Sequence, residues 1–453
     1  MTVVDVDVVV VGMGPGGEWA AERLATAGLT VAGVDDRLVG GECPYWGCVP
    51  SKMMIRAADL LAEGRRIPGI AGHSQVHPDW APVARRIRDE ATDDWDDKVA
   101  VDRFTGLGGQ FFRGQGRITA PGEVTVGDQV LRARRAIVLN TGTEPLVPPI
   151  DGLAGTPYWT NREAIEATEV PGSLLVIGAG AVGVELGQVF ARFGASVTMV
   201  EGKGKLVPGE EPEACELLQE VFAREGIDVR TGGMALAVQH SGGRFTVERD
   251  GGPKLSADQL LIATGRRTNL AGIGLGVLGL DDDLRAVPVD DHLRVAPGVW
   301  ALGDITGHGA FTHMSMYQAR IVVGSILGQE VSPAEYHAVP RVTFTDPEIG
   351  SVGLTERQAR EGGLDVRTGY YPLPKSTRGW IHKVGNDGFI KLVADPGRGI
   401  LVGATSVGPT GGEVLSMLAL AVHARVPVAR LREMIYAYPT FHRAIEAALE
   451  DLG

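Results

Sequence analysis

The chain is poor in cysteine and in positive charge, and it has no apolar run long enough to cross a bilayer. Its 453 residues include 3 cysteines, too few for a disulfide scaffold, so a closely spaced pair is more readily catalytic or metal-binding than structural. Lysine and arginine number 43 against 56 aspartates and glutamates, whereas a nucleic acid or an anionic membrane as partner would favour a basic surplus. We therefore expect a soluble protein with neither of those partners.

The first twelve residues, MTVVDVDVVVVG, are expected to form a strand and not a signal peptide. Asp5 and Asp7 interrupt the apolar stretch, and the segment has neither a basic leader nor a cleavage-like sequence. Together with the scarcity of cysteine, this predicts a cytoplasmic protein.

The length and the glycine content indicate several domains with special demands on the backbone. A chain of 453 residues exceeds what one hydrophobic core usually organises, so two or three domains are expected. Its 64 glycines are about twice the usual share. This excess requires an explanation in the backbone conformation.

A strand, a glycine-rich turn, a helix and a second strand ending in an acid occur twice. The first copy runs from Val8 to Asp35 and the second from Leu174 to Glu201. In such a unit the first glycine makes a tight turn, the second admits a pyrophosphate at the helix N-terminus, and the third allows close packing. The trailing acid accepts hydrogen bonds from a ribose. One glycine motif alone could be a plain turn, but two complete copies predict two different dinucleotides. The expected binding residues are Gly12, Gly14, Gly17 and Asp35, and Gly178, Gly180, Gly183 and Glu201.

Cys43 and Cys48 lie in the segment GGECPYWGCVPSK, directly after the first copy and therefore near the reactive end of the first dinucleotide. In an ideal helix residues five apart are separated by roughly 7.5 Å along the axis, beyond the Cα separation of about 7 Å that a disulfide tolerates. Pro44 and Gly47 could supply the distortion that a disulfide needs.

A zinc site at these cysteines would need two further nitrogen or sulfur ligands at matching spacing. Cys215 stands alone in an acidic helical stretch, and His73 and His77 form no recognisable motif. We therefore expect no metal, and we expect Cys215 to be a small core residue.

With these motifs the chain resembles the flavoprotein disulfide reductases, the family of glutathione reductase, dihydrolipoamide dehydrogenase and mercuric reductase. The resemblance covers essentially the whole chain. It includes the segments NTGTEP, IATGRR and ALGD, which begin at Asn140, Ile262 and Ala301, and the segments VTFTDPE, VGLT and GATSVGP of the last third. The last third is similar to the interface domain of the family, which implies a homodimer.

The resemblance implies an α/β fold with two Rossmann-like dinucleotide-binding domains and a C-terminal α+β dimerisation domain. FAD would bind to the N-terminal domain and NAD(P)H to the inserted one. The implied bounds, which could shift by several residues, are 1–151 and 271–335 for the FAD-binding domain, 152–270 for the NAD(P)-binding domain and 336–453 for the interface domain.

Further site residues follow from the same resemblance. Lys52 would lie at the flavin edge and pair with Glu185, where a positive charge stabilises the charge that develops on the reduced ring. Asp304 would accept hydrogen bonds from the ribityl chain of FAD. Without the resemblance, the first two would be an ordinary surface pair and Asp304 a turn residue. Gly142, Gly265 and Gly303 complete the expected cofactor-binding set.

The implied mechanism is ping-pong. NAD(P)H reduces FAD, the electrons reach the disulfide through Cys48, and Cys43 then meets the substrate. Because a thiolate is the attacking species, Cys43 needs a base or a depressed pKa.

The C-terminal segment departs from the family, in which a histidine before Pro-Thr and a glutamate five residues later form an acid-base dyad for the partner subunit. Tyr438 and Arg443 occupy these two places here. A tyrosine, with an ordinary pKa near 10, would need about 4 kcal/mol to act as a base at pH 7, so hydrogen-bond donation is easier for it. His442 is the nearest titratable replacement if its helix turns it inward, and a solvated helix position is the alternative.

Two other features bear on specificity. Tyr45 and Trp46, between the cysteines, either narrow the approach of the substrate or pack a distorted helix. Glu201 would accept ribose hydroxyls and repel a 2′-phosphate, so NADH is favoured, although Lys203 and Lys205 could soften that repulsion.

The leading hypothesis is an FAD-dependent NAD(P)H oxidoreductase that passes electrons through Cys43 and Cys48 to a small disulfide or thiol-type substrate. One alternative is a quinone, dye or metal-ion reductase, which needs less acid-base help. Mercury reduction is a minor option, because the C-terminal cysteine pair of mercuric reductase is missing. Another alternative is a dihydrolipoamide dehydrogenase-like subunit of a complex, or a non-catalytic redox sensor.

Overall fold

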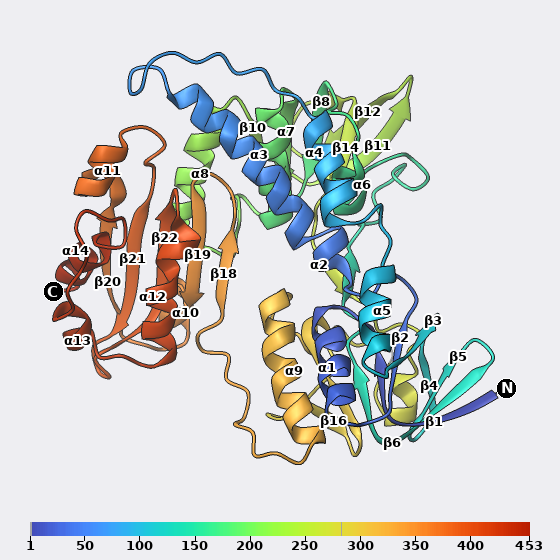
Figure 1. The fold of residues 1–453 in the computed structure, drawn as a ribbon. Coiled ribbons are helices and arrows are strands. Elements are labelled where there is room, and N and C mark those ends of the chain that lie inside the picture. Colours follow the sequence, from blue (N-terminus) through green and yellow to red (C-terminus); the bar gives the residue numbers. More distant parts are fainter. Residues whose placement is uncertain (1, 282) are drawn as a thin grey trace. The chain divides into compact units, whose positions relative to one another are not determined.

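The computed structural model describes residues 2–281 and 283–453, which form two compact units (Figure 1). Two helices, α3 (Cys48–Arg66) and α4 (Ala81–Arg86), carry the chain from one unit to the other. Unit 1 combines Met1–Ser51, Arg85–Leu146 and Arg266–Glu335, and unit 2 combines Lys52–Ala84, Val147–Gly265 and Tyr336–Gly453.

Unit 1 is built on a mainly parallel sheet with the strand order β16-β17-β6-β1-β2-β3. The central strand β1 (Thr2–Val11) pairs in parallel with β2 (Val31–Asp35) and with β6 (Gln129–Leu139). Its apolar run is buried on both faces, as expected of a central parallel strand. The other strands are β3 (Gln110–Arg113), β4 (Arg117–Ala120), β5 (Glu123–Val126), β16 (Arg294–Ala296) and β17 (Val299–Ala301).

The alternation of side chains along β1 serves two cores. Val8 and Val10 pack into the core that lies under α1 (Pro15–Thr26) and α9 (Thr312–Ile326), and Val9 and Val11 pack into the core on the other face. Figure 1 shows α1 and α9 side by side on the sheet. Smaller elements of this unit are α2 (Glu42–Tyr45), η1 (Ile87–Ala91), α5 (Lys98–Gly106), β7 (Thr143–Pro145), β15 (Arg266–Thr268), η2 (Leu275–Leu278) and η3 (Gly303–Thr306).

Residues 147–265 of unit 2 repeat the parallel arrangement, with the strand order β10-β9-β8-β14. Here β8 (Ser173–Ile177) leads through a glycine turn into α7 (Ala181–Arg192) and then into β9 (Ser196–Glu201). The remaining elements are α6 (Asn161–Glu166), α8 (Pro212–Arg224), β10 (Asp228–Thr231), β14 (Gln259–Ile262) and the antiparallel strands β11 (Ala235–Ser241), β12 (Arg244–Arg249) and β13 (Leu255–Ala257).

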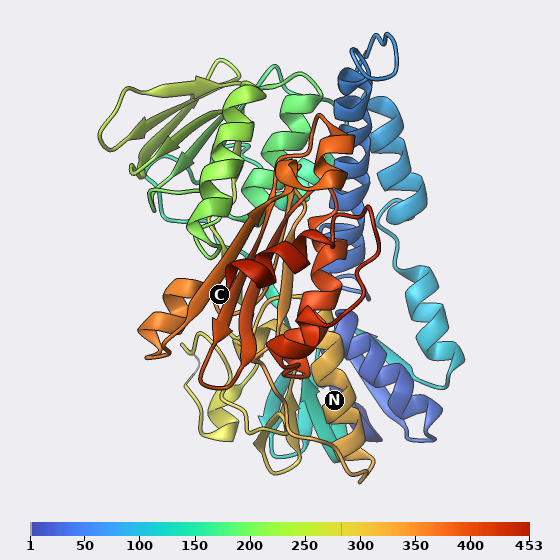
Figure 2. The same cartoon turned by 90° about the vertical axis from the view of Figure 1, so that its left-hand side faces the viewer.

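Residues 336–453 of unit 2 form an antiparallel sheet with the strand order β18-β19-β22-β21-β20. The helices α12 (Gly411–His423) and α14 (Ala444–Asp451) pack on this sheet and enclose an apolar core (Figure 2). The strands are β18 (Pro340–Thr343), β19 (Glu348–Gly353), β20 (Arg367–Pro372), β21 (Phe389–Asp395) and β22 (Ile400–Gly408). The shorter helices are α10 (Glu356–Glu361), η4 (Leu373–Lys375), α11 (Thr377–His382) and α13 (Val428–Arg432).

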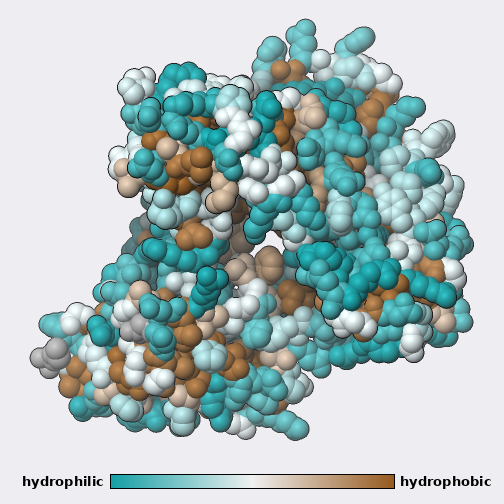
Figure 3. All heavy atoms as spheres, turned by 180° about the vertical axis from the view of Figure 1, so that it is seen from behind, coloured by the Kyte–Doolittle hydropathy of each residue, from teal (hydrophilic) through white to brown (hydrophobic). Residues whose placement is uncertain are grey.

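This architecture confirms the predicted fold class, since each parallel sheet contains one of the two glycine turns and the C-terminal part is α+β. Along the described stretches of the chain, no helix combines the length and the apolarity required to cross a membrane. On the face drawn in Figure 3 polar residues predominate, with apolar side chains in scattered patches, as is usual for a protein surface.

Candidate active site and dinucleotide sites

The first glycine turn joins β1 to α1 and leaves space at one position only. A Cβ atom on Gly17 would lie 2.0 Å from the carbonyl oxygen of Gly12, and one on Gly12 would lie 2.3 Å from the carbonyl oxygen of Asn140. At Gly14, the residue before α1, the nearest atom would be a side-chain nitrogen of Asn140 at 3.4 Å. The backbone is therefore approachable at the helix N-terminus, where a pyrophosphate would bind.

The second glycine turn repeats this geometry. A Cβ on Gly183 would lie 2.1 Å from the carbonyl oxygen of Gly178, and one on Gly178 would lie 2.3 Å from that of Ala263. Gly180, the residue before α7, would meet nothing within 4 Å. Both turns thus fit a dinucleotide by the same criterion.

The acid at the end of each second strand is tied to its glycine turn. Asp35 accepts hydrogen bonds from the backbone N–H groups of Met13 and Arg37, at 2.7 and 2.8 Å, and burial raises the pKa of its carboxyl. Glu201 accepts hydrogen bonds from the backbone N–H groups of Ala179 and Lys203, both at 2.8 Å. Met13 and Ala179 each stand between the first and second glycines. Carboxylate oxygens keep further lone pairs for ribose hydroxyls, so each acid can serve both purposes.

The redox cysteines are separated by a break in the helix. The helix α2 ends at Tyr45, Trp46 adopts φ −137°, and α3 begins at Cys48. A Cβ on Gly47 would lie 2.9 Å from the carbonyl oxygen of Glu42. The expected distortion is therefore present, and it occurs at Trp46 and Gly47. Pro44 lies within α2.

The two cysteines are present as thiols that share a hydrogen bond. This hydrogen bond and burial raise the pKa of Cys43, whereas Cys48 is exposed and begins α3. Because the N-terminus of a helix stabilises an anion, the position of Cys48 at the start of α3 is suited to a negative charge.

Thr312 joins this pair from the first turn of α9. Its hydroxyl lies 3.5 Å from the sulfur of Cys48, and its hydrogen bond to Cys43 acts to lower the pKa of that thiol. Thr312 was not expected from the sequence, and no motif signals it, because the contact joins residues 264 apart.

The cysteine segment is anchored on the first glycine turn. Gly40 adopts φ +105° and donates its N–H to the carbonyl oxygen of Met13 at 2.7 Å. Gly41 adopts φ +68°, and a Cβ there would lie 2.9 Å from the Cα of Gly14. Asp97 accepts the N–H of Val39 at 2.7 Å. These contacts hold the cysteine segment beside the first turn.

A chain of hydrogen bonds and an ion pair connects Asp304 with Glu42, the residue before Cys43. Thr143 donates its hydroxyl to Asp304 at 2.5 Å, and Arg266 donates to the hydroxyl and the carbonyl oxygen of Thr143 at 2.7 and 2.8 Å. Arg266 also lies 3.4 Å from the carboxylate of Glu42. Arg266 belongs to the segment IATGRR, but its link to Glu42 was not expected.

The three remaining predicted glycines adopt left-handed backbone conformations, which favour glycine. The φ values are +65° at Gly142, +129° at Gly265 and +78° at Gly303. A Cβ on Gly303 would also lie 2.7 Å from the side-chain oxygen of Asn140.

Lys52 and Glu185 form the expected ion pair, with 2.9 Å between Nζ and Oε2. The other carboxylate oxygen of Glu185 accepts the backbone N–H of Phe344 at 2.8 Å. The ammonium of Lys52 also lies 4.5 Å from the centre of the Phe344 ring. Phe344 belongs to the segment VTFTDPE, but no motif or spacing connects it with Lys52.

In the C-terminal segment Arg443, and not His442, lies against Tyr438. The Tyr438 side chain is 65% exposed, and the guanidinium of Arg443 is 5.4 Å from its ring centre. Arg443 also pairs with Glu446 at 2.9 Å. His442 is half-buried, with its ring 6.3 Å from that of Tyr436.

Tyr45, Trp46 and Cys215 can also be placed. Tyr45 is buried, and burial raises the pKa of its hydroxyl to about 12, which agrees with a packing role. Trp46 is half-buried. Cys215 is a core residue, as expected. Within residues 2–281 and 283–453, no group of three or more histidine, cysteine, aspartate or glutamate side chains could hold a metal ion.

Fold and site together define an enzyme with two glycine turns that each fit a dinucleotide, and with a pair of closely spaced cysteines. A family model for pyridine nucleotide-disulphide oxidoreductases matches residues 6–319, and the model for the dimerisation domain of the same family matches residues 339–449. The chain belongs to this family, and it is an FAD enzyme that uses NAD(P)H. The predicted family, cofactors and reaction class are confirmed.

The relatives agree over nearly the whole chain. Dihydrolipoyl dehydrogenase of Thermus scotoductus is 32% identical over 98% of this chain and 97% of its own length. Mercuric reductase of Acidithiobacillus ferrooxidans is 31% identical over 98% of this chain and 82% of its own. Among solved structures, LpdA of Mycobacterium tuberculosis has a TM-score of 0.87, with 27% identity and full coverage of both chains. The flavoprotein disulfide reductase RclA of Escherichia coli has a TM-score of 0.85, with 26% identity over 98% of this chain and 99% of its own.

Proposed function

We propose that the enzyme passes two electrons from NADH, through FAD and the Cys48–Cys43 pair, to a small disulfide or related thiol compound. The observation that carries this proposal is the pair itself. Its thiols share a hydrogen bond, Cys48 begins a helix, and Thr312 contacts both sulfurs. FAD, when bound, accepts a hydride from NAD(P)H and passes two electrons to a disulfide.

The geometry of the two glycine turns supports an assignment of the dinucleotide sites. The segments 1–151 and 271–335 would bind FAD through Gly14 and Asp35, with Asp304 at the ribityl chain. The segment 152–270 would bind NADH through Gly180 and Glu201. The preference for NADH rests on the buried carboxylate of Glu201, which would repel a 2′-phosphate.

The cysteines reduce the substrate by two exchanges. The Cys43 thiolate attacks one sulfur of the substrate disulfide, forms a mixed disulfide and releases a first thiolate. Cys48 then gives its proton to the first released thiolate, attacks the sulfur of Cys43, closes the intramolecular disulfide and releases a second thiolate, which is protonated from water. The hydrogen bond from Thr312 acts to lower the pKa of Cys43, which favours the thiolate that starts the first exchange.

The segment 336–453 would form a homodimer and present its C-terminal residues to the partner subunit. Exposed apolar side chains support an interface there: Leu420 is 63% exposed and Ile435 is 96% exposed. We assign to Tyr438, which Arg443 orients, the role of donating a hydrogen bond to a leaving thiolate. His442 is retained as a second acid-base candidate. The enzyme would act in the cytoplasm.

Anaerobic titration with NADH tests this function. We expect full reduction to need about two equivalents of NADH per FAD, with a long-wavelength absorbance that Cys48→Ser abolishes. Bleaching by one equivalent, without that absorbance, would mean that the cysteines are redox-silent. Screening with small disulfides, and with Cys43→Ser as control, then identifies the substrate.

Two other functions are supported by relatives. One RclA structure that matches this chain, with a TM-score of 0.86 and 26% identity, is a Cu(II) complex, which favours metal-ion reduction as a second candidate. NADH oxidation that depends on Cu(II) and survives Cys43→Ser would favour it over disulfide reduction. The dihydrolipoyl dehydrogenases favour the role of a complex subunit, which reduction of NAD⁺ by dihydrolipoamide would support.

A further inference from the structure

Lys52 is held by two residues from different parts of unit 2. Glu185, on α7, provides a carboxylate oxygen 2.9 Å from the ammonium. Phe344, which directly follows β18, provides the face of an aromatic ring 4.5 Å away. A cation at this distance from a ring is attracted by the negative face of the π-system. The ammonium is therefore positioned by both partners.

Glu185 also fixes Phe344. One carboxylate oxygen pairs with Lys52 and the other accepts the Phe344 N–H at 2.8 Å, while the Glu185 side chain is only 7% exposed. A carboxylate that serves two donors from opposite sides leaves neither of them free to move alone. The position of the aromatic ring and that of the ammonium are thus linked through one buried group.

The same face of α7 holds the next residues of this segment. Gln188 accepts the N–H of Asp346 at 2.8 Å and donates to the carbonyl oxygen of Asp346 at 3.0 Å. Arg192, with a side chain 3% exposed, donates to the carboxylate of Asp346 at 2.7 Å. Glu185, Gln188 and Arg192 are three and four residues apart, which places them on one side of a helix.

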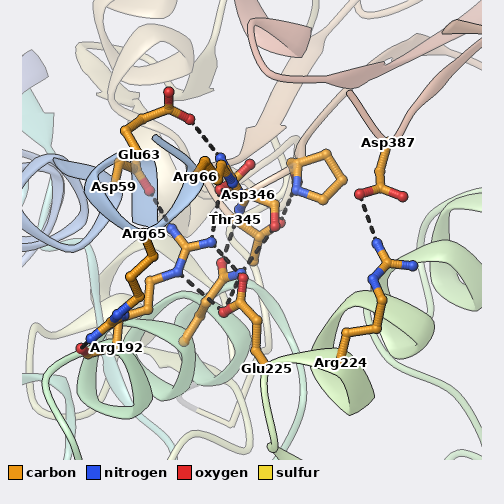
Figure 4. Close-up of polar contacts among 12 residues, drawn as sticks. Asp59, Glu63, Arg65, Arg66, Arg192, Arg224, Glu225, Thr345, Asp346 and Asp387 are labelled. Atoms are coloured by element: carbon orange, nitrogen blue, oxygen red, sulfur yellow. Dashed lines mark hydrogen bonds and ion pairs between the residues drawn. The ribbon is translucent and has the colours of Figure 1, made fainter. Parts of the chain in front are cut away.

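The helix α3 contacts the far end of this arrangement. Arg192 also pairs with Asp59 at 2.7 Å and with Glu225 at 2.6 Å, and Arg66 pairs with Asp346 at 2.6 Å (Figure 4). The close-up shows these side chains converging on the guanidinium of Arg192. Removal of one partner from so enclosed a group leaves a charge without compensation, so the contacts resist separate movement.

We propose that Phe344 is a positioning residue for Lys52, and that Gln188 and Arg192 hold the Phe344–Asp346 segment in place for this purpose. The inference rests on the proposed function and on the expectation that Lys52 lies at the flavin edge. It adds that the first loop of the dimerisation domain sets the position of the charge that assists hydride transfer. A loss of the ring would leave the ammonium paired with Glu185 but free to swing away from its site.

Chemical labelling of Lys52 tests the proposal without relying on turnover. Brief treatment of the protein with acetic anhydride, followed by mass spectrometry, gives the reactivity of Lys52 relative to the exposed Lys254. We expect Phe344→Leu to raise this ratio about fivefold, because the cation loses its aromatic contact. Phe344→Tyr should restore the value of the unaltered protein, since it keeps the ring.

A matched pair of variants tests the anchoring of the segment. Asp346→Asn removes the carboxylate that binds Arg192 and Arg66, and it should raise the labelling of Lys52 about twofold. Asp387→Asn removes a carboxylate from the nearby Arg224–Asp387 ion pair. Among the hydrogen bonds described for this protein, that pair makes none to the Phe344–Asp346 segment. Asp387→Asn should therefore leave the labelling ratio of Lys52 to Lys254 unchanged. A ratio that is unchanged in Phe344→Leu, or raised equally in Asp387→Asn and Asp346→Asn, would overturn the proposal.

The rate of flavin reduction by NADH in a stopped-flow experiment links the labelling to the chemistry. It should fall in Phe344→Leu and recover in Phe344→Tyr. If the unaltered enzyme reduces no disulfide while the labelling behaves as expected, the proposed substrate fails and the positioning role stands. If the enzyme reduces disulfides, but Phe344→Leu changes neither the labelling of Lys52 nor the rate of flavin reduction, the positioning role is wrong and the proposed function stands.

Discussion

The hydroxyl of Thr312 lies 3.5 Å from the sulfur of Cys48, although 264 residues separate the two in the chain. Thr312 also interacts with Cys43, so one hydroxyl at the start of α9 serves both members of the redox pair. Its hydrogen bond acts to lower the pKa of Cys43, against the opposite effects of burial and of the hydrogen bond with Cys48.

Replacement of this hydroxyl should make the cysteines less acidic. The hydrogen bond from Thr312 lowers the pKa of Cys43, so Thr312→Val should raise that pKa and slow alkylation by iodoacetamide at pH 7 about threefold. The pH dependence of alkylation, read for each cysteine by mass spectrometry, measures the effect. Thr312→Ser retains the hydroxyl and should behave as the unaltered enzyme, and equal slowing in both variants would point to a packing effect.

The choice between NADH and NADPH should depend on the charge of Glu201. Its carboxylate also accepts two backbone hydrogen bonds, so Glu201→Gln is a gentler change than Glu201→Arg because it keeps one acceptor. We expect Glu201→Gln to raise the ratio of kcat/KM for NADPH over NADH about tenfold, since a 2′-phosphate no longer meets a negative charge. We expect Glu201→Arg to raise the ratio further and to lower thermal stability. An unchanged ratio in both variants would remove Glu201 from the site.

Cys215 should be irrelevant to the redox chemistry. It is 2% exposed in the core of unit 2, and burial is the main cause that raises the pKa of its thiol to about 11. Cys215→Ala should lower the free energy of unfolding by about 1 kcal/mol through the lost packing, and it should leave the NADH titration at two equivalents. A changed stoichiometry would mean that a third thiol takes part.

Asp59 should make the stability of the protein depend on pH in the acidic range. Burial raises the pKa of Asp59 to about 6, although Arg192 partly counteracts it. A carboxyl whose pKa is higher in the folded than in the unfolded state contributes stability at low pH, which is lost as the pH rises through about 6. Asp59→Asn cannot ionise, so its stability relative to the unaltered protein should improve between pH 4.5 and pH 8 in urea unfolding. A constant difference would show that Asp59 does not titrate in this range.

The two glycine turns were predictable because their determinants lie close together in sequence. Gly12, Gly17 and Asp35 fall within one βαβ unit, and the steric reason for each glycine is local to that unit. The redox pair was predictable for the same reason. The residues alone did not indicate that the carboxylates of Asp35 and Glu201 also accept backbone hydrogen bonds from the glycine turns.

Contacts between distant segments were not predictable. Phe344 meets Lys52 across almost 300 positions of the chain, and no periodicity or spacing reports such an approach. The same is true of Arg192, whose three carboxylate partners come from α3, from the residue after α8 and from the segment before β19. The replacement of the C-terminal dyad could be noticed from Tyr438 and Arg443, but their stacking required the structure.

The double use of Asp35 and Glu201 limits how this enzyme can be re-engineered. The Glu201 carboxylate, which we propose selects between NADH and NADPH, also accepts the backbone N–H groups of Ala179 and Lys203 and so stabilises the second glycine turn. A change made for selectivity therefore weakens the turn as well, and a useful variant will need a second substitution that restores a hydrogen-bond acceptor for the N–H of Ala179.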